Sequence, residues 1–250
     1  VTSQPVPYHA DTTAIFNTLC QQNSNSLLLD SAEIGSKNSL QSLILINAAV
    51  KITCFGNQVT FRALNANGKQ VLKEIHPVLS QLGTVSAVNF DNEFSVQFAP
   101  LDNQLDEDSK LQAATIFDGL RVISNHYQHS STPVFLGGLF AYDLVANFIP
   151  MQGVELKDDG IHCPDYSFYL AENLITIDHQ SQQATLKSFC FSQEEQVEVA
   201  KTALSIAQKL KNIDGVLSIK AASHEVSTNF EDPEFTGIVK ALKHHINIGD

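Results

Sequence analysis

Two hydrophobic periods alternate along the chain, and each predicts a different kind of element. Apolar residues that recur every three or four positions indicate amphipathic helices, because this spacing places them on one face. Apolar residues at every second position indicate half-buried strands. Helices are predicted after Asp11 and over 71–82, 106–127, 194–210 and 232–246. Strands are predicted over 26–31, 40–55, 58–64, 85–90, 94–98, 134–142, 166–178 and 184–191.

Most of the predicted strands occur as pairs joined by short turns, and helices separate the pairs. Gly56-Asn57 closes a hairpin between 50–55 and 58–64, and the polar turn 179–183 joins two longer strands. This order favours an α+β fold over a parallel βαβ fold. We therefore expect mainly antiparallel sheets packed with helices.

Several residues at helix ends support these boundaries. Asp11 and Asp232 are predicted N-caps, and Pro233 suits the first position of a helix. The acidic residues 106–108 are interpreted as first-turn residues that favour the helix dipole, in preference to a metal cluster. The helix over 194–210 is expected to bury Val197, Ala200, Leu204 and Ala207.

Two local features of the predicted strands point to close approach or binding. Gly137 and Gly138 lie inside one strand, where glycine usually marks a bulge or the close approach of a backbone or ligand. The run Leu27–Leu29 is expected to be a buried strand that stops at Asp30-Ser31. A carboxylate, a hydroxyl and freed backbone donors at one place suit a small zwitterion, although the same residues also suit an ordinary turn.

Composition and charge narrow the possible partners. The 250 residues are 43% apolar and 17% charged, which is a globular composition, and the net charge of −12 disfavours nucleic acid. The basic residues are scattered, so no face suits an anionic membrane. The most apolar stretches, 40–50 and 133–142, are too short to cross a bilayer. We therefore expect neither a nucleic-acid nor a membrane partner.

The cysteines predict a reducing compartment. Cys20, Cys54, Cys163 and Cys190 form no C-x-x-C pair and match no zinc spacing. Scattered cysteines in a large acidic domain are typical of reduced, buried thiols. The sequence therefore favours a cytoplasmic protein.

A search for catalytic motifs finds no constellation. The glycines form no dinucleotide-binding or phosphate-binding loop, and no G-x-S-x-G is present. The pairs His126/His129 and His244/His245 are interpreted as surface histidines, and His162-Cys163 as loop neighbours. From pattern alone we assign no catalytic residue and no metal ligand.

One segment carries a resemblance to a known family. The sequence LLLDSAEIGSK at Leu27–Lys37 resembles the L-L-L-E-S-A signature of anthranilate synthase component I. Further segments resemble that family in the same order, and the likeness extends from about Asp11 onward. These segments are 51–68, 100–121, 135–148, 163–180 and 232–250.

The resemblance implies a specific activity for the whole protein. The family converts chorismate to anthranilate and pyruvate, with ammonia supplied by a glutamine amidotransferase subunit. It requires Mg²⁺ and is inhibited by L-tryptophan, and its fold is α+β. The family's catalytic histidine, Mg²⁺-binding glutamates and chorismate-binding arginine match no position here. The resemblance therefore places the Mg²⁺ ligands outside this chain, which alone is expected to be inactive.

The resemblance also assigns an effector site. Asp30, Ser31 and Ala32 match part of the family's tryptophan-sensing site, with Asp30 standing where the family has the longer Glu. Arg121 and Ser167 match positions whose change relaxes feedback, although one family example has Cys at the latter. These five residues are the candidate contacts with L-tryptophan.

The same comparison divides the chain and leaves two alternatives open. Residues 1–228 are expected to form a regulatory α+β domain, and 229–250 the first helix of a chorismate-binding domain whose remainder is missing. The 250 residues are thus interpreted as a fragment of a longer protein. The alternatives are a fragment of aminodeoxychorismate synthase component I and a non-catalytic small-molecule binding domain.

Overall fold

The computed structural model describes most of the chain. It covers residues 1–21, 23–30, 40–89, 92–100, 106–128, 133–149, 163–213 and 228–249. The chain divides into two compact units, Val1–Val216 and Leu217–Asp250. The second unit contains helix α6 (Asp232–Ile248), and the first contains the other elements described below.

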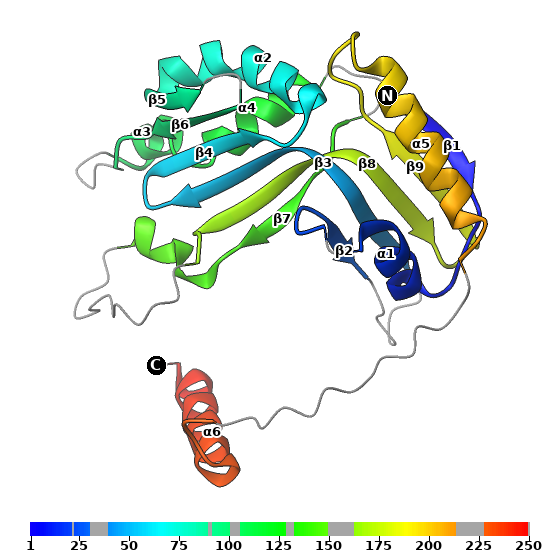
Figure 1. The fold of residues 1–250 in the computed structure, drawn as a ribbon. Helices are drawn as coiled ribbons and strands as arrows, with labels where there is room; N and C mark the ends of the chain where they lie inside the picture. Colours follow the sequence, from blue (N-terminus) through cyan, green and yellow to red (C-terminus); the bar gives the residue numbers. More distant parts are fainter. Residues whose placement is uncertain are drawn as a thin grey trace. The chain divides into compact units, whose positions relative to one another are not determined.

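A single antiparallel sheet forms the framework of the first unit (Figure 1). Over the described residues its strand order is β1-β9-β8-β3-β4-β6-β5, with β2 also beside β3 and β7 beside β8. All the pairings between these strands are antiparallel, so the predicted α+β class is confirmed. The strands are β1 (Thr2–Val6), β2 (Leu27–Leu29), β3 (Gln41–Phe55), β4 (Gln58–Ala63), β5 (Thr84–Asn89), β6 (Glu93–Gln97), β7 (Leu136–Phe140), β8 (Tyr166–Asp178) and β9 (Gln183–Ser188).

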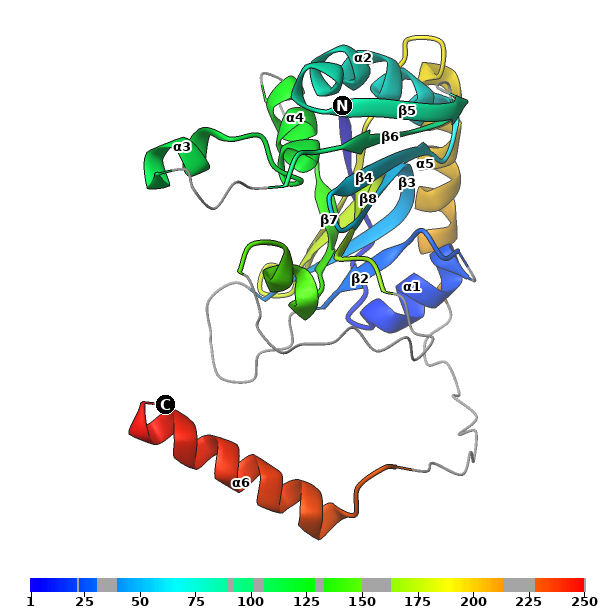
Figure 2. The ribbon, with the colours of Figure 1, turned by 90° about the vertical axis from the view of Figure 1, so that its left-hand side faces the viewer.

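The two long central strands, β3 and β8, organise the whole sheet. They pair from Gln41↔Asp178 to Cys54↔Tyr166, and the register shifts between Leu45 and Val50. Such irregularities bend a strand and increase its twist. Figures 1 and 2 show the resulting curled sheet, in which different helices pack on the two halves of β3.

Helices cover the two halves of the sheet separately. α2 (Ala66–Leu82) packs on β3, β4, β5 and β6, and α4 (Asp118–His126) packs on α2 (Figure 2). α1 (Thr12–Cys20) packs on β3 and on α5 (Gln196–Leu210), which also packs on β9. The predicted N-cap of α1 is confirmed, because the Asp11 carboxylate accepts a hydrogen bond from the Ala14 N–H.

Apolar burial follows this division. One core joins the later part of β3 with β4, β6, α2 and Tyr166, and a second joins the early part of β3 with α1, β8, β9 and α5. A third cluster is formed around Leu45, Ala171 and Phe189. Fully burying a Leu, Ile or Phe side chain contributes roughly 2 kcal/mol, so these clusters hold the sheet and helices together.

The predicted helix over 106–127 is wrong in one respect, because it is broken into two. α3 (Glu107–Gln112) ends where Ala113 turns extended, with ψ of 140°, and α4 begins at Asp118. The Asp118 carboxylate accepts hydrogen bonds from the Thr115 N–H and hydroxyl, which stabilises the turn between the helices. Asp106 caps α3 by accepting from the Ser109 N–H, consistent with a helix-start role for the acidic residues.

The predicted buried face of α5 is also wrong. Val197 and Leu204 are 63% and 59% exposed, whereas the buried residues lie two or three positions later. The predicted and the observed buried residues both have helical spacing. Only the observed residues face β9 and α1 and so extend the core that these elements form. The buried residues are Val199, Ala203, Ile206 and Leu210.

Three smaller expectations also change. β2 is only half-buried, with Leu29 exposed, rather than a buried strand. The strand predicted over 134–142 is shorter, since β7 is followed by a 3-10 helix, η1 (Tyr142–Asn147). In α6 the N-cap is Glu231, one residue before Asp232, and none of its residues is buried.

Candidate functional site

Asp30 lies where β2 ends. Leu29, the last residue of β2, pairs with Leu43 of β3. Asp30 follows Leu29, and Ser42 precedes Leu43, so the antiparallel pairing brings Asp30 and Ser42 side by side. Ser42 is fully buried, and its hydroxyl donates a hydrogen bond to Asp30 Oδ1. Asp30 itself is exposed. The sheet therefore presents a carboxylate to solvent while a buried hydroxyl fixes one of its oxygens.

Two further side chains extend this contact into the molecule. His179, just after β8, has Nε2 2.8 Å from Ser42 Oγ. Its other ring nitrogen, Nδ1, lies 3.2 Å from the Tyr8 hydroxyl, and the two rings meet edge to face. Asp30, Ser42, His179 and Tyr8 thus form one continuous hydrogen-bonded row.

The row contains Asp, Ser and His but does not have the order of a nucleophilic triad. In a triad the serine is terminal and histidine lies between serine and carboxylate. Here Ser42 lies between Asp30 and His179, and its hydroxyl is 0% exposed. The arrangement can position a carboxylate, but it cannot deliver a serine oxygen to a substrate.

Sequence reasoning identified Asp30 and missed its three supporting residues. Ser42 is the one hydroxyl in the apolar run 40–50, which is a weak signal of a buried polar role. Its partner His179 is 137 residues away, so only the β3–β8 pairing brings them together. Ser31 and Ala32, the neighbouring predicted contacts, lie outside the described residues.

Arg121 lies on α4, in a different part of the first unit. Its guanidinium pairs with Asp118 at 3.2 Å and lies 6.0 Å from the centre of the Phe117 ring. Phe117 in turn contacts Phe140 of β7 edge to face. Arg121 therefore borders an aromatic cluster built around β7 and the start of β8.

Ser167 lies on β8 at the same aromatic cluster. It pairs with Thr53 of β3 on one side and Leu139 of β7 on the other, and both its chain neighbours, Tyr166 and Phe168, contact Phe140. Thr53 is eleven residues from Ser42 along β3, about 36 Å in a straight strand. The structure thus brings Arg121 and Ser167 to one region and Asp30 to another.

A second polar cluster, also missed from the sequence, surrounds Glu172 of β8. Asn65, which caps α2, and Asn67 both donate side-chain hydrogen bonds to Glu172 Oε2, at 2.9 and 2.8 Å. Glu172 is 7% exposed, and this burial raises the pKa of its carboxyl. Asn67 also donates to the Phe189 carbonyl, so the cluster ties α2 to β8 and to the end of β9.

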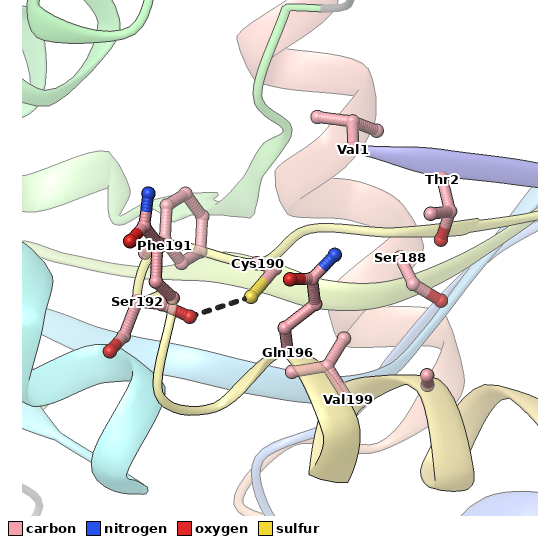
Figure 3. Close-up of a pocket in the computed structure, with 10 residues that line it drawn as sticks. Val1, Thr2, Ser188, Cys190, Phe191, Ser192, Gln196 and Val199 are labelled. Atoms are coloured by element: carbon pink, nitrogen blue, oxygen red, sulfur yellow. Dashed lines mark hydrogen bonds between the residues drawn. The ribbon is translucent and has the colours of Figure 1, made fainter.

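A surface hollow of about 400 Å³ lies between β1, the end of β9 and α5 (Figure 3). Cys190 lies in this hollow and donates from Sγ to the Ser192 carbonyl at 2.9 Å. Ser188, Gln196 and Val199 also line it, and none of the side chains that line the hollow is an acid or a base.

The cysteines partly fit the prediction of reduced, buried thiols. All four are free, but only Cys20 and Cys54 are buried, and Cys163 is exposed. Burial raises the pKa of Cys20 to about 11 and that of Cys54 to about 12. These two thiols are therefore protonated at neutral pH and unreactive.

Within the described ranges, no three His, Cys, Asp or Glu side chains are grouped so that they could hold a metal ion. No helix in the part of the chain that the structure describes is both long and apolar enough to span a bilayer.

Comparison with known proteins identifies the family. A family described as chorismate binding enzyme matches residues 71–250, which is most of the chain. The chain belongs to the chorismate-binding enzymes. The match includes the later part of the sheet, Arg121 and Ser167, and it continues through α6.

Curated relatives within this family are anthranilate synthase component 1 proteins. The protein of that name from Haemophilus influenzae is 85% identical over all 250 residues, which are 48% of its own length. Those from Vibrio cholerae and Escherichia coli are 39% and 34% identical over 98% and 97% of this chain, and 47% of their own lengths. The predicted resemblance is confirmed, and this chain spans about half the length of the curated relatives it matches.

A solved structure, anthranilate synthase component I from Streptococcus pneumoniae TIGR4, aligns with 97% of this chain and 45% of its own. The identity is 14% and the TM-score is 0.39.

Proposed function

We propose that this chain is the tryptophan-sensing part of an anthranilate synthase component I. The observation that carries the proposal is the 85% identity over all 250 residues to a curated protein of that name. The Asp30 carboxylate, fixed by Ser42 and open to solvent, adds a group suited to the ammonium end of an amino acid.

The proposed reaction of the whole protein is the conversion of chorismate and ammonia to anthranilate and pyruvate. A glutamine amidotransferase subunit would supply the ammonia. Mg²⁺ would be held by residues outside this chain, as the resemblance to the family implies. A cytoplasmic location suits this chemistry and agrees with the free thiols.

L-tryptophan is the proposed effector. Asp30 would accept hydrogen bonds from its ammonium group, and the adjoining Ser31 and Ala32 would complete this part of the pocket. Arg121 and Ser167 would influence the same response from the aromatic cluster around Phe140. Their position at the other end of β3 favours an indirect effect over a direct contact.

Inhibition would follow from a coupling between two sites. Tryptophan would favour an arrangement of the whole protein with low chorismate affinity, and chorismate would weaken tryptophan binding by the same factor. In this scheme 1–228 is the regulatory domain and 229–250, with α6, begins the chorismate-binding domain. The exposed apolar residues of α6, such as Phe235 and Leu242, agree with a helix that packs on further chain.

The reaction product is the experiment that tests this proposal. The full-length protein, given chorismate, ammonia and Mg²⁺, should form anthranilate, and L-tryptophan should suppress it. Formation of aminodeoxychorismate would assign the related synthase instead, and failure to consume chorismate would favour a non-catalytic binding domain.

Two variants of the experiment test the division of labour. The 250-residue chain alone should form no anthranilate under the same conditions, and measurable turnover by a clean preparation would refute this. Ser31→Phe in the full-length protein should block the pocket, so that unchanged tryptophan inhibition would show that Ser31 is not a contact.

A further inference from the structure

We propose that Tyr8, His179 and Ser42 form a directed hydrogen-bond relay that holds the Asp30 carboxylate in place to receive the ammonium group of the amino-acid effector. This inference rests on the proposed function, since it assigns positioning residues to that site. In this relay the Asp30 carboxylate sets the direction, and His179 connects Ser42 to Tyr8.

The direction follows from counting donors. Ser42 has one hydroxyl proton and donates it to Asp30 Oδ1, since a carboxylate can only accept. The contact of 2.8 Å between Ser42 Oγ and His179 Nε2 must then run the other way, with Nε2–H as the donor. The relay is complete when Nδ1 carries no proton and accepts the hydrogen bond from the Tyr8 hydroxyl, 3.2 Å away.

The relay is built from three parts of the first unit. Tyr8 precedes α1, Ser42 lies on β3, and His179 follows β8 with its backbone N–H donating to the Leu40 carbonyl at 2.9 Å. Ser42 is fully buried, so its hydroxyl cannot turn to water for another partner. A buried polar group without a partner is costly, which makes the observed direction the stable one.

The consequence for Asp30 is a fixed carboxylate that still accepts hydrogen bonds. One donor on Oδ1 uses only part of the accepting capacity of a carboxylate, which has about four lone-pair positions. Because Asp30 is exposed, the remaining positions can receive an ammonium group. Ordering the side chain in advance reduces the entropy that the ligand must otherwise overcome.

The first test measures the proton positions in the relay in the absence of any ligand. Nitrogen NMR of histidine-labelled full-length protein shows which ring nitrogens of His179 carry a proton. The relay requires the proton on Nε2 and none on Nδ1, and Tyr8→Phe should weaken this preference. A proton on Nδ1 in the wild type would overturn the relay, whether or not tryptophan binds.

The second test compares two ligands on the full-length protein by calorimetry. L-tryptophan carries the ammonium group, and indole-3-propionate lacks it. His179→Phe should weaken tryptophan binding about fivefold to tenfold, the usual effect of one hydrogen bond, and leave indole-3-propionate unchanged. His179→Gln should restore most of the tryptophan affinity, because its amide can donate to Ser42 and accept from Tyr8.

A matched control is His126→Phe, which removes an imidazole from another carboxylate, Glu74, 3.0 Å away. It should leave both affinities unchanged. Equal weakening of both ligands by His179→Phe would indicate a merely structural role and overturn the inference, as would no weakening of either. A wild-type protein that binds no tryptophan would refute the proposed function, and with it the role of the relay in effector binding, while the NMR result would still decide the relay itself.

Discussion

At the scale of single residues, Glu172 is the side chain whose environment most clearly opposes its charge. It lies within the sheet at 7% exposure, and its hydrogen-bond donors are neutral amides, those of Asn65 and Asn67. Burial disfavours the ionised form more than these two donors favour it, so the pKa of the carboxyl is raised. Glu172 therefore links three elements while its charge costs stability at neutral pH.

Glu172→Gln should stabilise the chain at pH 7 by about 1 kcal/mol, because it removes the charge and keeps an acceptor for both amides. The pKa of Glu172 is higher in the folded chain than in the unfolded chain. Its contribution to stability is therefore greatest at a pH below the unfolded pKa, where the carboxyl is protonated in both states. This contribution is lost as the pH rises through the folded pKa. Thermal melts should therefore show a higher Tm for the variant at pH 7 and a gap that closes below about pH 4.5, its ordinary pKa.

The control for this prediction is Glu198→Gln, at an exposed Glu on α5 that pairs with Lys201 at 2.6 Å. Exposed pairs of this kind contribute little, so its Tm should stay near that of the parent chain at both pH values. A destabilised Glu172→Gln, or a gap that does not change with pH, would contradict the account of Glu172.

Residue-scale prediction succeeded where a local signal existed. Asp30 stood out because a polar pair follows an apolar run and because the segment resembles a known signature. His179 and Glu172 carry no such signal and Ser42 carries only a weak one, since each has a partner more than a hundred residues away. The register of β3 against β8 brings Ser42 near His179, and the start of α2 brings Asn65 and Asn67 to Glu172.

At the scale of elements, the hydrophobic period predicted the kind of element better than its buried face. The hairpin at Gly56-Asn57 and the pair β8 and β9 are confirmed, because their alternation and turns are local. The break after α3 was missed because apolar spacing continues across it, and Asp118 stabilises the turn only through Thr115. The face of α5 was missed because two rows share the same spacing.

The buried face of α5 can be tested with a pair of matched substitutions. Val199→Asp buries a carboxylate at a position 6% exposed and should destabilise the chain by about 3 kcal/mol or more. Val197→Asp, at a position 63% exposed, should change the stability by less than about 0.5 kcal/mol. Urea unfolding of both variants measures the difference, and a larger loss from Val197→Asp would show that the sequence-predicted face is correct.

The close approach of β7 to β8 can be tested at Gly138. A Cβ there would meet the backbone of Ser167 and lie 2.6 Å from Phe168 Cα, so the strands would have to separate. Gly138→Ala should destabilise the chain by about 2 kcal/mol, as overpacking usually does. Gly237→Ala is the control, because nothing lies within 4 Å of its Cβ in α6, and it should not lower the Tm. Equal Tm values for the two variants would contradict the close approach.

At the scale of the whole molecule, the fold class follows from the sequence and the function follows from comparison. Hairpins and intervening helices predicted an α+β fold, and every described strand pairing is antiparallel. No catalytic group could be assigned from pattern, and family membership carries the link to chorismate instead. The chain spans about half the length of these relatives, so the activity of the whole protein remains a proposal.

The central claim is that this chain senses L-tryptophan through Asp30, and an inhibition curve tests it most directly. Anthranilate formation by the full-length protein is measured against tryptophan concentration for the wild type and Asp30→Ala, each relative to its own uninhibited rate. Loss of a charge-assisted hydrogen bond should raise the half-inhibiting concentration about tenfold or more in the variant. Superimposable curves, or a wild type that tryptophan does not inhibit, would contradict the claim.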